Sequence, residues 1–358
     1  MVYQIRIPRK VKESGELETA ARPTMAALAK VFSGDRFLRL SDPKIITKVE
    51  NCLPVLPSLD VISARDIKGR WGLPFGRQIE FSGNPDSGKT TMLILVAAAA
   101  QKAGHTVLWV ETEYSLNNNR AKNVGVNLEE LWTTFPDYLE QGAESIEEAV
   151  KAMPKRDEPG YDTEHGLVVC FDSIAATPTK AEFDGAMTDQ HVAEFARGMF
   201  KFQRRLNSRI AKRNVMIVYS NQLKSKIGVS YGKKTITYGG NAIRYHASIR
   251  FECIMIGKLK DKNDEICGIN MKLDNQKNKC FIPYRKVEGV EFSFLNGFSY
   301  GQNMLYALCE KGLAAKVGPQ YNIFCLGKDV KMRKDQFIST IDKDKILGER
   351  LRKALDAI

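Results

Sequence analysis

The first pattern along the chain is an alternation between short apolar runs and longer stretches with helical periodicity, from about residue 78 to residue 220. The helical stretches are Thr90–Ala103, closed by Gly104, and His191–Arg213. The strand-like runs are Gln78–Ser82, Thr106–Val110, Leu167–Phe171 and Val215–Ser220. Apolar strands that alternate with helices indicate a parallel sheet covered on both faces.

After Ala242 the pattern changes to strand-like alternation of apolar and polar residues, in Ser248–Gly257 and Gly268–Leu273. We expect these strands to extend the same sheet. The helix predicted over His191–Arg213 is amphipathic. Its buried side is expected to carry Val192, Phe195, Met199, Phe202, Leu206 and Ile210.

The two ends of the chain differ from this core. Residues 1–50 contain one short predicted helix, Pro23–Phe32, between charged flanks. Residues 300–358 contain two predicted helices around a β-like stretch; they are Asn303–Lys311 and Lys345–Ala357, around Tyr321–Leu326. The organisation therefore predicts one large core and two small appendages.

Composition excludes several classes of protein. With 43% hydrophobic and 27% charged residues, the chain is neither disordered nor collagen-like. Its longest apolar run, Met92–Ala100, is far shorter than the roughly 20 residues of a membrane span. The first 23 residues are polar and charged, so we expect no secretory signal. Seven scattered cysteines and four scattered histidines favour free thiols in a reducing cytosol over disulfides or a zinc site.

The charge of the chain points to a polyanionic partner. The formal net charge is +12, and 15 basic residues but one acid, Glu252, lie between Arg197 and Lys260. This excess includes a loop rich in lysine and glycine: Lys224, Lys226, Gly228, Gly232, Lys233 and Lys234. One interpretation of such a run is a solvent-exposed surface with no binding role. A nucleic-acid backbone is the alternative, because each neutralised phosphate releases counterions.

The strongest local signal is a phosphate-binding loop between the first predicted strand and the first predicted helix. Residues 83–90 read Gly-Asn-Pro-Asp-Ser-Gly-Lys-Thr and satisfy G-x-x-x-x-G-K-[ST]. Backbone amides and the helix N-terminus would bind phosphates, Lys89 would reach the β- and γ-phosphates, and the Thr90 hydroxyl would bind Mg²⁺. A chance glycine-rich turn is the alternative, and the strand–loop–helix context argues against it.

Two acids complete the expected chemistry. Asp172 ends the strand Leu167–Phe171 and suits a second magnesium anchor, the Walker B role. Glu113 follows the strand Thr106–Val110 and could polarise the attacking water. Spacing alone does not distinguish that role from a surface acid beside Glu111.

Taken together, the motifs resemble the RecA family of homologous-recombination ATPases over nearly the whole chain. Besides the phosphate loop and Asp172, the resemblance rests on the approach sequence Gly72–Arg77 and on Val110–Glu113, whose second acid is the family's catalytic glutamate. Further matches are Pro178, Lys180, Ala181 and Glu182, then Asn221-Gln222, Gly239-Gly240-Asn241-Ala242, and Lys277-Asn278-Lys279.

The resemblance implies an α/β fold with a RecA-type P-loop ATPase core, whose mostly parallel central sheet is flanked by helices. A small N-terminal helical and β polymerisation element over residues 1–50 and a small α+β C-terminal domain over 300–358 would flank the core, 51–299. The activity implied is an ATP-dependent recombinase that coats single-stranded DNA as a helical homo-polymer, searches for homology and exchanges strands in recombination and repair. ATP and Mg²⁺ would be its cofactors, with single-stranded and homologous double-stranded DNA as partners, in the cytoplasm of a bacterial cell or phage-infected host.

Site residues carry over from the family position by position. Catalytic roles fall to Glu113, Lys89, the γ-phosphate sensor Gln222, and Lys277 and Lys279, which would reach the neighbouring subunit's ATP. Tyr245 would couple subunits, and Thr90 and Asp172 would hold Mg²⁺. The nucleotide-binding set is Gly83, Asn84, Pro85, Asp86, Ser87, Gly88, Lys89, Thr90, Thr91, Asn117, Arg120, Asp172 and Tyr300, with Phe298 as a competitor for Tyr300.

The resemblance also implies two DNA-binding loops, at about residues 185–192 and 223–238. Val192 and Ile227 would wedge between base steps, although core packing is the alternative for both. The full set of DNA contacts is Val192, Arg197, Arg204, Ser225, Ile227, Gly228, Val229, Gly239, Gly240 and Asn241.

The chain also departs from the family's pattern. Asn117 and Arg120 stand where the adenine pocket usually has Asp and Tyr, which suggests a changed nucleotide preference. Ile254 and Met255 replace two arginines often assigned to a second DNA site, and Asp274 stands where a base is usual. Lys272 and Lys260 remain candidates there. A divergent branch, with a phage origin as one interpretation, would explain these differences.

Two other functions are compatible with the same core. A ring-forming helicase or other motor would share the phosphate site, because fold does not fix function. The Gly-Gly-Asn-Ala run and the paired lysines argue against it. A DNA-coating protein that binds ATP without turnover is the non-enzymatic alternative, and Glu113 argues against that.

Overall fold

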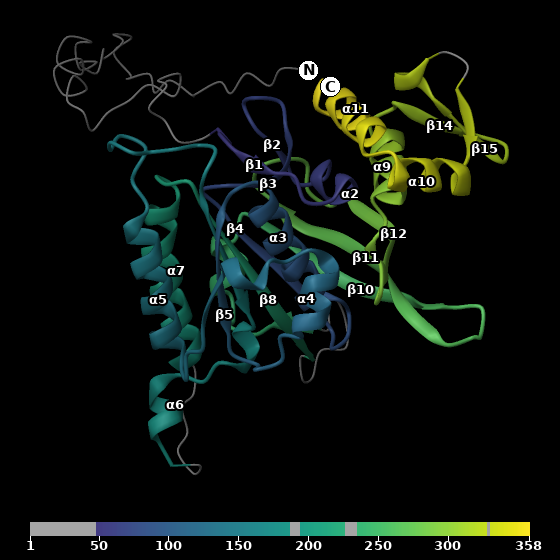
Figure 1. Ribbon diagram of the computed structural model, residues 1–358. Helices are drawn as coiled ribbons and strands as arrows, with labels where there is room; N and C mark the ends of the chain where they lie inside the picture. Colours follow the sequence, from purple (N-terminus) through teal and green to yellow (C-terminus); the bar gives the residue numbers. More distant parts are fainter. Residues whose placement is uncertain (1–47, 187–193, 226–234, 328–329) are drawn as a thin grey trace, which may run out of the picture. The chain divides into compact units, whose positions relative to one another are not determined.

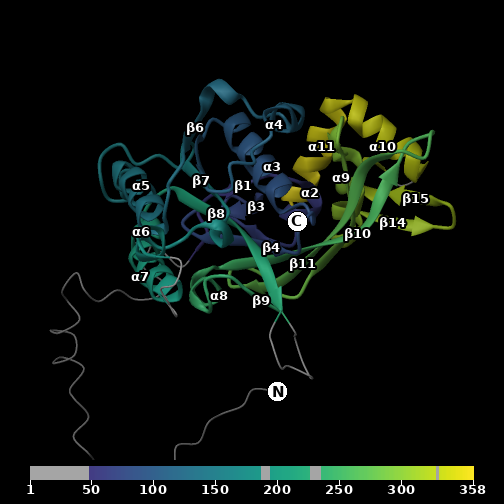
Figure 2. The same ribbon diagram turned by 90° about the horizontal axis from the view of Figure 1, so that it is seen from below.

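A ten-stranded mixed sheet carries the fold (Figures 1 and 2). The protein's structure is a computed structural model that describes residues 48–186, 194–225, 235–327 and 330–358. The predicted helix Pro23–Phe32, together with Val192, Ile227, Gly228 and Val229, lies outside the described residues. The strands of the sheet are β4 (Gln78–Gly83), β5 (Thr106–Glu111), β6 (Leu131–Thr134), β7 (Leu167–Asp172), β8 (Val215–Ser225), β9 (Thr235–Thr237), β10 (Ile249–Lys260), β11 (Ile266–Asn278), β12 (Lys286–Ser293) and β13 (Gly297–Phe298).

The order of the strands is β13-β12-β11-β10-β4-β8-β7-β5-β6, and β9 pairs with β8. From β10 to β6 all neighbours are parallel, and from β10 to β13 all are antiparallel. The predicted mostly parallel sheet and its extension by later strands are confirmed. Strands β10 and β11 are longer than their apolar patterns predict, because their antiparallel ladder pairs backbone groups well beyond the core.

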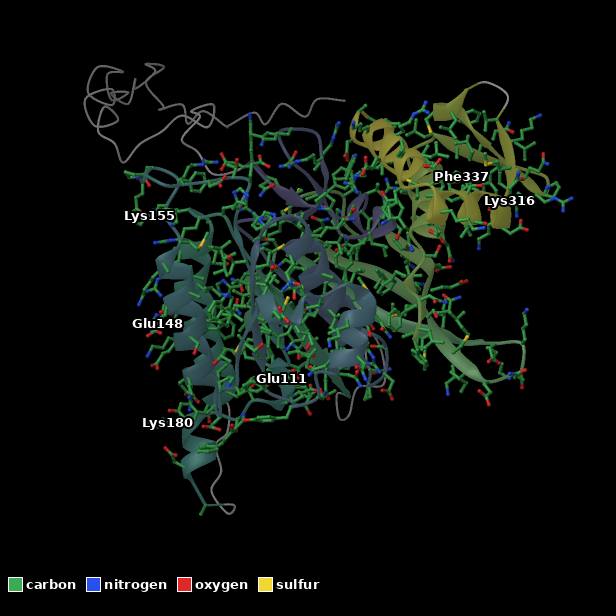
Figure 3. The ribbon with its side chains drawn as sticks, in the orientation of Figure 1. Glu111, Glu148, Lys155, Lys180, Lys316 and Phe337 are labelled. Atoms are coloured by element: carbon green, nitrogen blue, oxygen red, sulfur yellow. The ribbon has the colours of Figure 1, made fainter. Side chains whose placement is uncertain are left out.

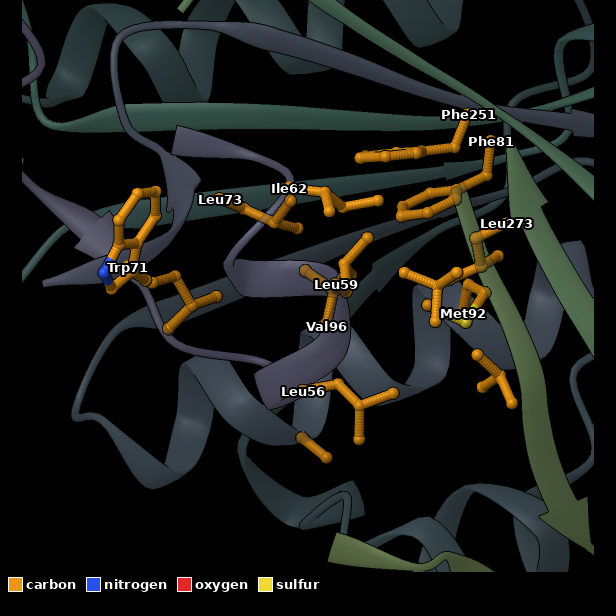
Figure 4. Packing of buried hydrophobic residues seen from close by; sticks show 14 of the residues in the cluster. Leu56, Leu59, Ile62, Trp71, Leu73, Phe81, Met92, Val96, Phe251 and Leu273 are labelled. Carbon is orange, nitrogen blue, oxygen red and sulfur yellow. The ribbon is translucent and has the colours of Figure 1, made fainter. Parts of the chain in front are cut away.

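Two hydrophobic cores cover the two faces of the sheet, and β7 alternates between them. Val168 and Cys170 face the core that includes α3 and α4, whereas Val169 and Phe171 face the core that includes α5 and α7. Figure 4 shows the first core, where Phe81 stacks on Phe251. The helices around the sheet are α3 (Lys89–Lys102), α4 (Asn118–Val124), α5 (Leu139–Ala152), α6 (Lys180–Asp184), α7 (Glu194–Ile210) and α8 (Ala242–His246).

Helix α7 buries the stripe that its sequence predicts, although it is shorter than His191–Arg213 in the described residues. Met199, Phe202, Leu206 and Ile210 are buried, and Phe195 packs against them half-buried. Figure 1 shows α5 beside α7 on this face, and their packing closes the second core.

Residues after β13 build a small α+β unit. A three-stranded antiparallel sheet forms from β14 (Ala314–Val317), β15 (Gln320–Ile323) and β16 (Lys331–Arg333). Helices α9 (Tyr300–Glu310), α10 (Lys334–Lys343) and α11 (Lys345–Asp356) surround it. The prediction of a β stretch over Tyr321–Leu326 is wrong in its second half. Phe324–Leu326 is a 3-10 helix, because the ladder with β16 ends at Asn322 and the chain turns at Gly327.

Helix α11 is fastened to the start of the described chain through Arg352. This segment contains β1 (Cys52–Leu53), α2 (Pro57–Asp60), β2 (Ala64–Arg65) and β3 (Trp71–Pro74). The Arg352 guanidinium donates to Asp60 Oδ2 at 2.6 Å and to the Trp71 carbonyl oxygen, and Trp71 Nε1 donates to the Leu355 carbonyl at 3.2 Å. Because Asp60 is fully buried, its charge requires this partner.

Among the helices of the described ranges, none combines the length and the apolar composition that a bilayer crossing requires.

His105 gives the fold a predicted pH dependence. Its buried ring packs on Phe75, and its Nδ1 accepts a hydrogen bond from the Gly166 amide at 2.8 Å. Burial lowers the pKa of His105 to about 4. The unfolded state therefore binds more protons between pH 6.5 and 4, and stability falls as the pH drops through that window. By pH 5 we expect a loss of about 2 kcal/mol relative to pH 7.

Urea unfolding of the wild type and of His105→Asn at pH 7 and pH 5 measures this effect. Asparagine keeps an acceptor but does not titrate, so the variant should lose less stability on acidification. Equal losses in the wild type and His105→Asn would contradict the assignment.

Candidate active site

The phosphate-binding loop leaves β4 and enters α3 in contact with two other strands. A Cβ on Gly83 would lie 2.4 Å from the carbonyl oxygen of Cys253 on β10. Gly88 has a φ of +89°, and a Cβ there would lie 2.1 Å from the sulfur of Met271 on β11. Both positions exclude a side chain, so the glycines let the loop turn directly against the sheet.

Lys89, the first residue of α3, lines a cavity of about 580 Å³ at this loop. Its side chain is almost fully buried, and Nζ donates to the Asn84 carbonyl at 2.7 Å. Burial lowers the pKa of Lys89, while Asp172, Glu113 and other neighbours act to raise it. The cavity therefore holds the Lys89 cation close to several carboxylates, an arrangement suited to an anionic ligand carried with a metal ion.

Asp172 has the free oxygen that a magnesium site requires. Its Oδ1 accepts from the Ser220 hydroxyl, whereas Oδ2 is buried and has no partner among the described residues. Burial raises the pKa of Asp172 to about 6, against the lowering effect of the Ser220 and Thr90 hydroxyls. A buried, unpartnered carboxylate oxygen beside the Thr90 hydroxyl fits a hard divalent cation, which would remove the cost of that burial.

Glu113 lies in the same cavity, half-buried, and not on an open surface. Its Oε1 accepts from the Ser173 hydroxyl and, at 3.4 Å, from Gln222 Nε2. Glu111, labelled in Figure 3, is buried and holds the following turn in place. Its Oε1 accepts from the Glu113 amide at 2.9 Å, and its Oε2 accepts from Trp109 Nε1 at 3.0 Å. The two neighbouring glutamates therefore differ in role: Glu111 positions, and Glu113 faces the cavity.

The order of the strands divides the cavity into two flanks. On one side of β4, strands β8, β7 and β5 supply Gln222, Asp172 and Glu113. On the other side, β10 to β12 and the turn after β12 supply apolar walls. We call these the hydrolytic flank and the binding flank. The binding flank contains Met255, Ile266, Ile269, Phe292 and Phe294.

The structure does not bring Tyr300 to this cavity. Tyr300 begins α9 and lines two other cavities, as does the competing residue Phe298. Phe294 lines the Lys89 cavity instead. The sequence could have indicated Phe294, because alternate residues of a strand share a face and Phe294 lies two residues after Phe292, just beyond the end of β12. The turn at Gly297 then carries the chain away toward α9.

Asn117 is fixed by a local contact at the start of α4. As the N-cap residue, it accepts a hydrogen bond from the Arg120 amide at 2.9 Å. Arg120 lines the Lys89 cavity, whereas Asn117 is not among its lining residues. Of the predicted pair, the structure brings Arg120 to the site.

Lys277 and Lys279 line a second cavity, of about 520 Å³, together with Arg244, Tyr245 and Arg250. Lys277 Nζ donates to the carbonyls of Arg244 at 2.6 Å and of Tyr245 at 3.1 Å, and Lys279 Nζ donates to that of Tyr245 at 3.3 Å. Burial, and then the charge of Lys279, lower the pKa of Lys277 to about 8. Within one chain, the paired lysines are thus separate from Lys89.

Two groups of predicted DNA contacts are neighbours in space. Arg197 and Arg204 are exposed on α7, which packs against α8. Gly239 and Gly240, before α8, lie against α7, where a Cβ on Gly240 would be 3.5 Å from Ala196 Cβ. Ser225 ends β8, and Asn241 is the exposed N-cap residue of α8.

A buried charge network connects the base of the phosphate loop with this region. Glu80 on β4 is fully buried and pairs with Arg250 on β10. Asn221 Nδ2 donates to Glu80 Oε1 at 2.9 Å and to the Tyr238 carbonyl at 3.0 Å. The Tyr238 amide in turn donates to the Gln222 carbonyl at 3.3 Å. Gln222 and the segment before Gly239 are therefore held together.

Comparison with known proteins gives one consistent result. A family model described as the RecA N-terminal domain matches residues 20–299. Protein RecA of Treponema denticola is 34% identical over 295 residues, which is 82% of this chain and 67% of the relative. Protein RecA of Paracoccus denitrificans is 32% identical over 313 residues, 87% of this chain and 82% of the relative. Protein RecA of one Caulobacter strain is 35% identical over 277 residues, which is 77% of this chain and 73% of the relative.

The free oxygen of Asp172 leads to a prediction about magnesium. Asp172→Asn replaces a carboxylate oxygen by an amide, so magnesium should no longer strengthen nucleotide binding. Removing a residue that only supports a metal ligand typically lowers metal affinity by about tenfold or more. Removing a ligand itself should therefore reduce the effect of Mg²⁺ on nucleotide affinity by at least that factor. Titration of a fluorescent nucleotide with Mg²⁺ or with EDTA measures the ratio of the two affinities.

The control is Asp261→Asn at the tip of the β10–β11 hairpin, where amides of Asn263 and Glu265 still find an acceptor. It should behave as the wild type. If Asp172→Asn retained the full response to Mg²⁺, Asp172 would not be a ligand of the metal.

Proposed function

The chain belongs to the RecA family of recombinases, and we propose that the cavity at Lys89 is where it hydrolyses ATP. Members of the family are DNA-dependent ATPases that use Mg²⁺, assemble into filaments on single-stranded DNA and exchange strands with a homologous duplex, and this chain shares that activity. One observation carries the assignment of the site: Lys89, Asp172, Glu113 and Gln222, far apart in the sequence, line one cavity.

Each of these residues receives a role from its surroundings. Lys89 and the loop amides bind the β- and γ-phosphates. Asp172 and Thr90 hold the magnesium ion, which supplies charge neutralisation at the phosphates. Glu113 takes the proton of the attacking water, and its Oε2 has no hydrogen bond within the described part of the chain.

Gln222 connects this chemistry to DNA. Its side chain contacts Glu113, its carbonyl accepts from Tyr238, and Asn221 beside it is bonded to the buried Glu80. Any displacement of Gln222 at the γ-phosphate is therefore passed to the segment that precedes Gly239 and Gly240. This supports a sensor that couples bound ATP to the affinity for DNA.

The second cavity completes the proposal at the subunit level. Lys277 and Lys279 reach the ATP of a neighbouring subunit, with Tyr245, exposed beside them, in the contact. Residues 1–50 form the polymerisation element, 51–299 the ATPase core and 300–358 a C-terminal domain. Arg197, Arg204 and Gly239–Asn241 contribute to the primary DNA site. The cytoplasm of a bacterial or phage-infected cell is the proposed location.

Joint-molecule formation tests the proposed function. Labelled single strands and supercoiled duplex are mixed with protein, ATP and magnesium, with heterologous strands in parallel. Product that requires homology is expected. Glu113→Gln should still form joint molecules while its DNA-stimulated ATPase falls by about a hundredfold or more, because only the proton acceptor is lost.

Asp137→Asn, a change at an exposed acid, is the control and should keep both activities. DNA-stimulated ATPase without joint molecules would favour a motor protein. Normal turnover by Glu113→Gln would remove the glutamate from the mechanism.

Gln222→Ala should separate two properties that the wild type couples. The variant is expected to bind ATP normally, because Gln222 is not part of the phosphate loop, but to bind single-stranded DNA equally well with ATP and with ADP. Fluorescence anisotropy of labelled DNA measures both affinities. A variant that still binds DNA more tightly with ATP than with ADP would contradict the sensor role.

A further inference from the structure

Hydrogen-bond donors border the apolar binding flank of the Lys89 cavity. Lys258 on β10 belongs to this flank, and Ser115 and Arg120, from the segment after β5, line the same cavity. The acids that line the cavity, Asp86, Glu113 and Asp172, belong to the phosphate loop and the hydrolytic flank. Arginine and lysine only donate, so a base held at this flank meets fixed donors, with the Ser115 hydroxyl as the one adaptable group.

Helix α4, which carries the exposed Arg120, is held beside this flank at two points. Asn117 caps the start of α4, and one turn after Arg120 the Asn123 side chain donates to the Phe294 carbonyl at 3.4 Å. Residues three apart lie on the same side of a helix, so Arg120 lies toward the turn that carries Phe294. The Arg120 guanidinium itself makes no hydrogen bond or ion pair with the described residues.

Purine bases differ in what they offer to such a donor. At positions 6 and 7, guanine and hypoxanthine present two acceptors, O6 and N7, which match the two parallel N–H groups of an arginine. Adenine presents N7 but carries an amino group at position 6, so one donor of the guanidinium faces another donor. A bidentate arginine contact therefore favours a 6-oxopurine over adenine.

We propose that Arg120 makes this cavity a 6-oxopurine site, so that the protein binds and hydrolyses GTP and ITP in addition to ATP, and in preference to it. Phe294 and the neighbouring apolar side chains contact the faces of the base, and Arg120 reads its edge. Lys258 is a second donor on the same flank. The inference rests on the proposed function, since it assumes that the triphosphate is held by Lys89.

The preference should appear in KM and not in kcat. The base lies away from the transferred phosphate, so the arginine contact stabilises the ground state and the transition state equally. A good bidentate contact discriminates between bases by about fivefold or more, and we expect KM for ITP and GTP to be lower than for ATP by that factor.

The experiment measures kcat and KM of the full-length protein for ATP, GTP and ITP with saturating single-stranded DNA. It also measures displacement of a fluorescent ADP analogue by ADP, GDP and IDP. ITP and IDP separate the effect of the 6-oxo group from that of the 2-amino group of guanine. Arg120→Met keeps an unbranched apolar stem but has no donor, and it should lose the preference through KM.

Lys122→Met is the matched control, because Lys122 is an exposed cation on the same helix that does not line the cavity. It should keep the wild-type ratio of KM values. Arg120→Lys, with a single donor group, should retain part of the preference.

Two results would overturn the inference: a wild type that uses ATP as well as or better than ITP, or a preference that survives in Arg120→Met. In both, the proposed function stands as long as ATP is hydrolysed. A protein that neither binds nor hydrolyses any of the three nucleotides would instead remove the proposed function.

Discussion

The parallel pairing of β5, β7, β8 and β4 is the constraint on which the site depends. Parallel strands end at one edge of a sheet, and their register here aligns Glu111 with Asp172 and Gly83 with Gln222. Residues that follow these strands are thereby brought to one cavity, where Glu113 accepts hydrogen bonds from Ser173 and Gln222. Beyond β4 the sheet continues through β10, β11 and β12, and these strands with the turn after β12 contribute the apolar binding flank.

Burial of Glu80 below the phosphate loop makes this edge a rigid unit. Burying an unpaired carboxylate costs several kcal/mol, so Glu80 is tolerated only with Arg250 and Asn221 as partners. These partners come from β10 and β8, the two strands beside β4. The network thus ties the phosphate loop, the strand that carries Gln222 and the segment before Gly239 into one element, which is what a nucleotide sensor coupled to DNA requires.

The sequence predicts those parts of the molecule in which the apolar residues of the pattern are also the residues that become buried. Strands β5 and β7 are largely apolar runs, β4 alternates apolar Ile79 and Phe81 with polar residues, and the predicted bounds of all three lie within a residue of the observed ones. Helix α5 buries Leu139, Ile146 and Val150 at helical spacing but is otherwise mostly polar, and its buried Glu147 is satisfied by Arg205 and Arg209 on α7, a contact that the sequence does not reveal. The family resemblance matches Tyr300 to the nucleotide site, but it does not register that the chain turns away at Gly297, and Tyr300 lines other cavities. The order of the motifs indicates the site, but only the structure shows in which direction the chain leaves a turn.

The separation of Lys89 from Lys277 and Lys279 within one chain determines how many complete sites an assembly can contain. An assembly that pairs these two cavities contains one fewer complete site than it has subunits. Its terminal subunits are also chemically distinct: one end presents a phosphate loop that lacks the neighbour's lysines, and the other presents lysines with no nucleotide to contact. Such a polymer is polar by construction. Its two ends expose different groups, so addition of a subunit at one end is not chemically equivalent to addition at the other.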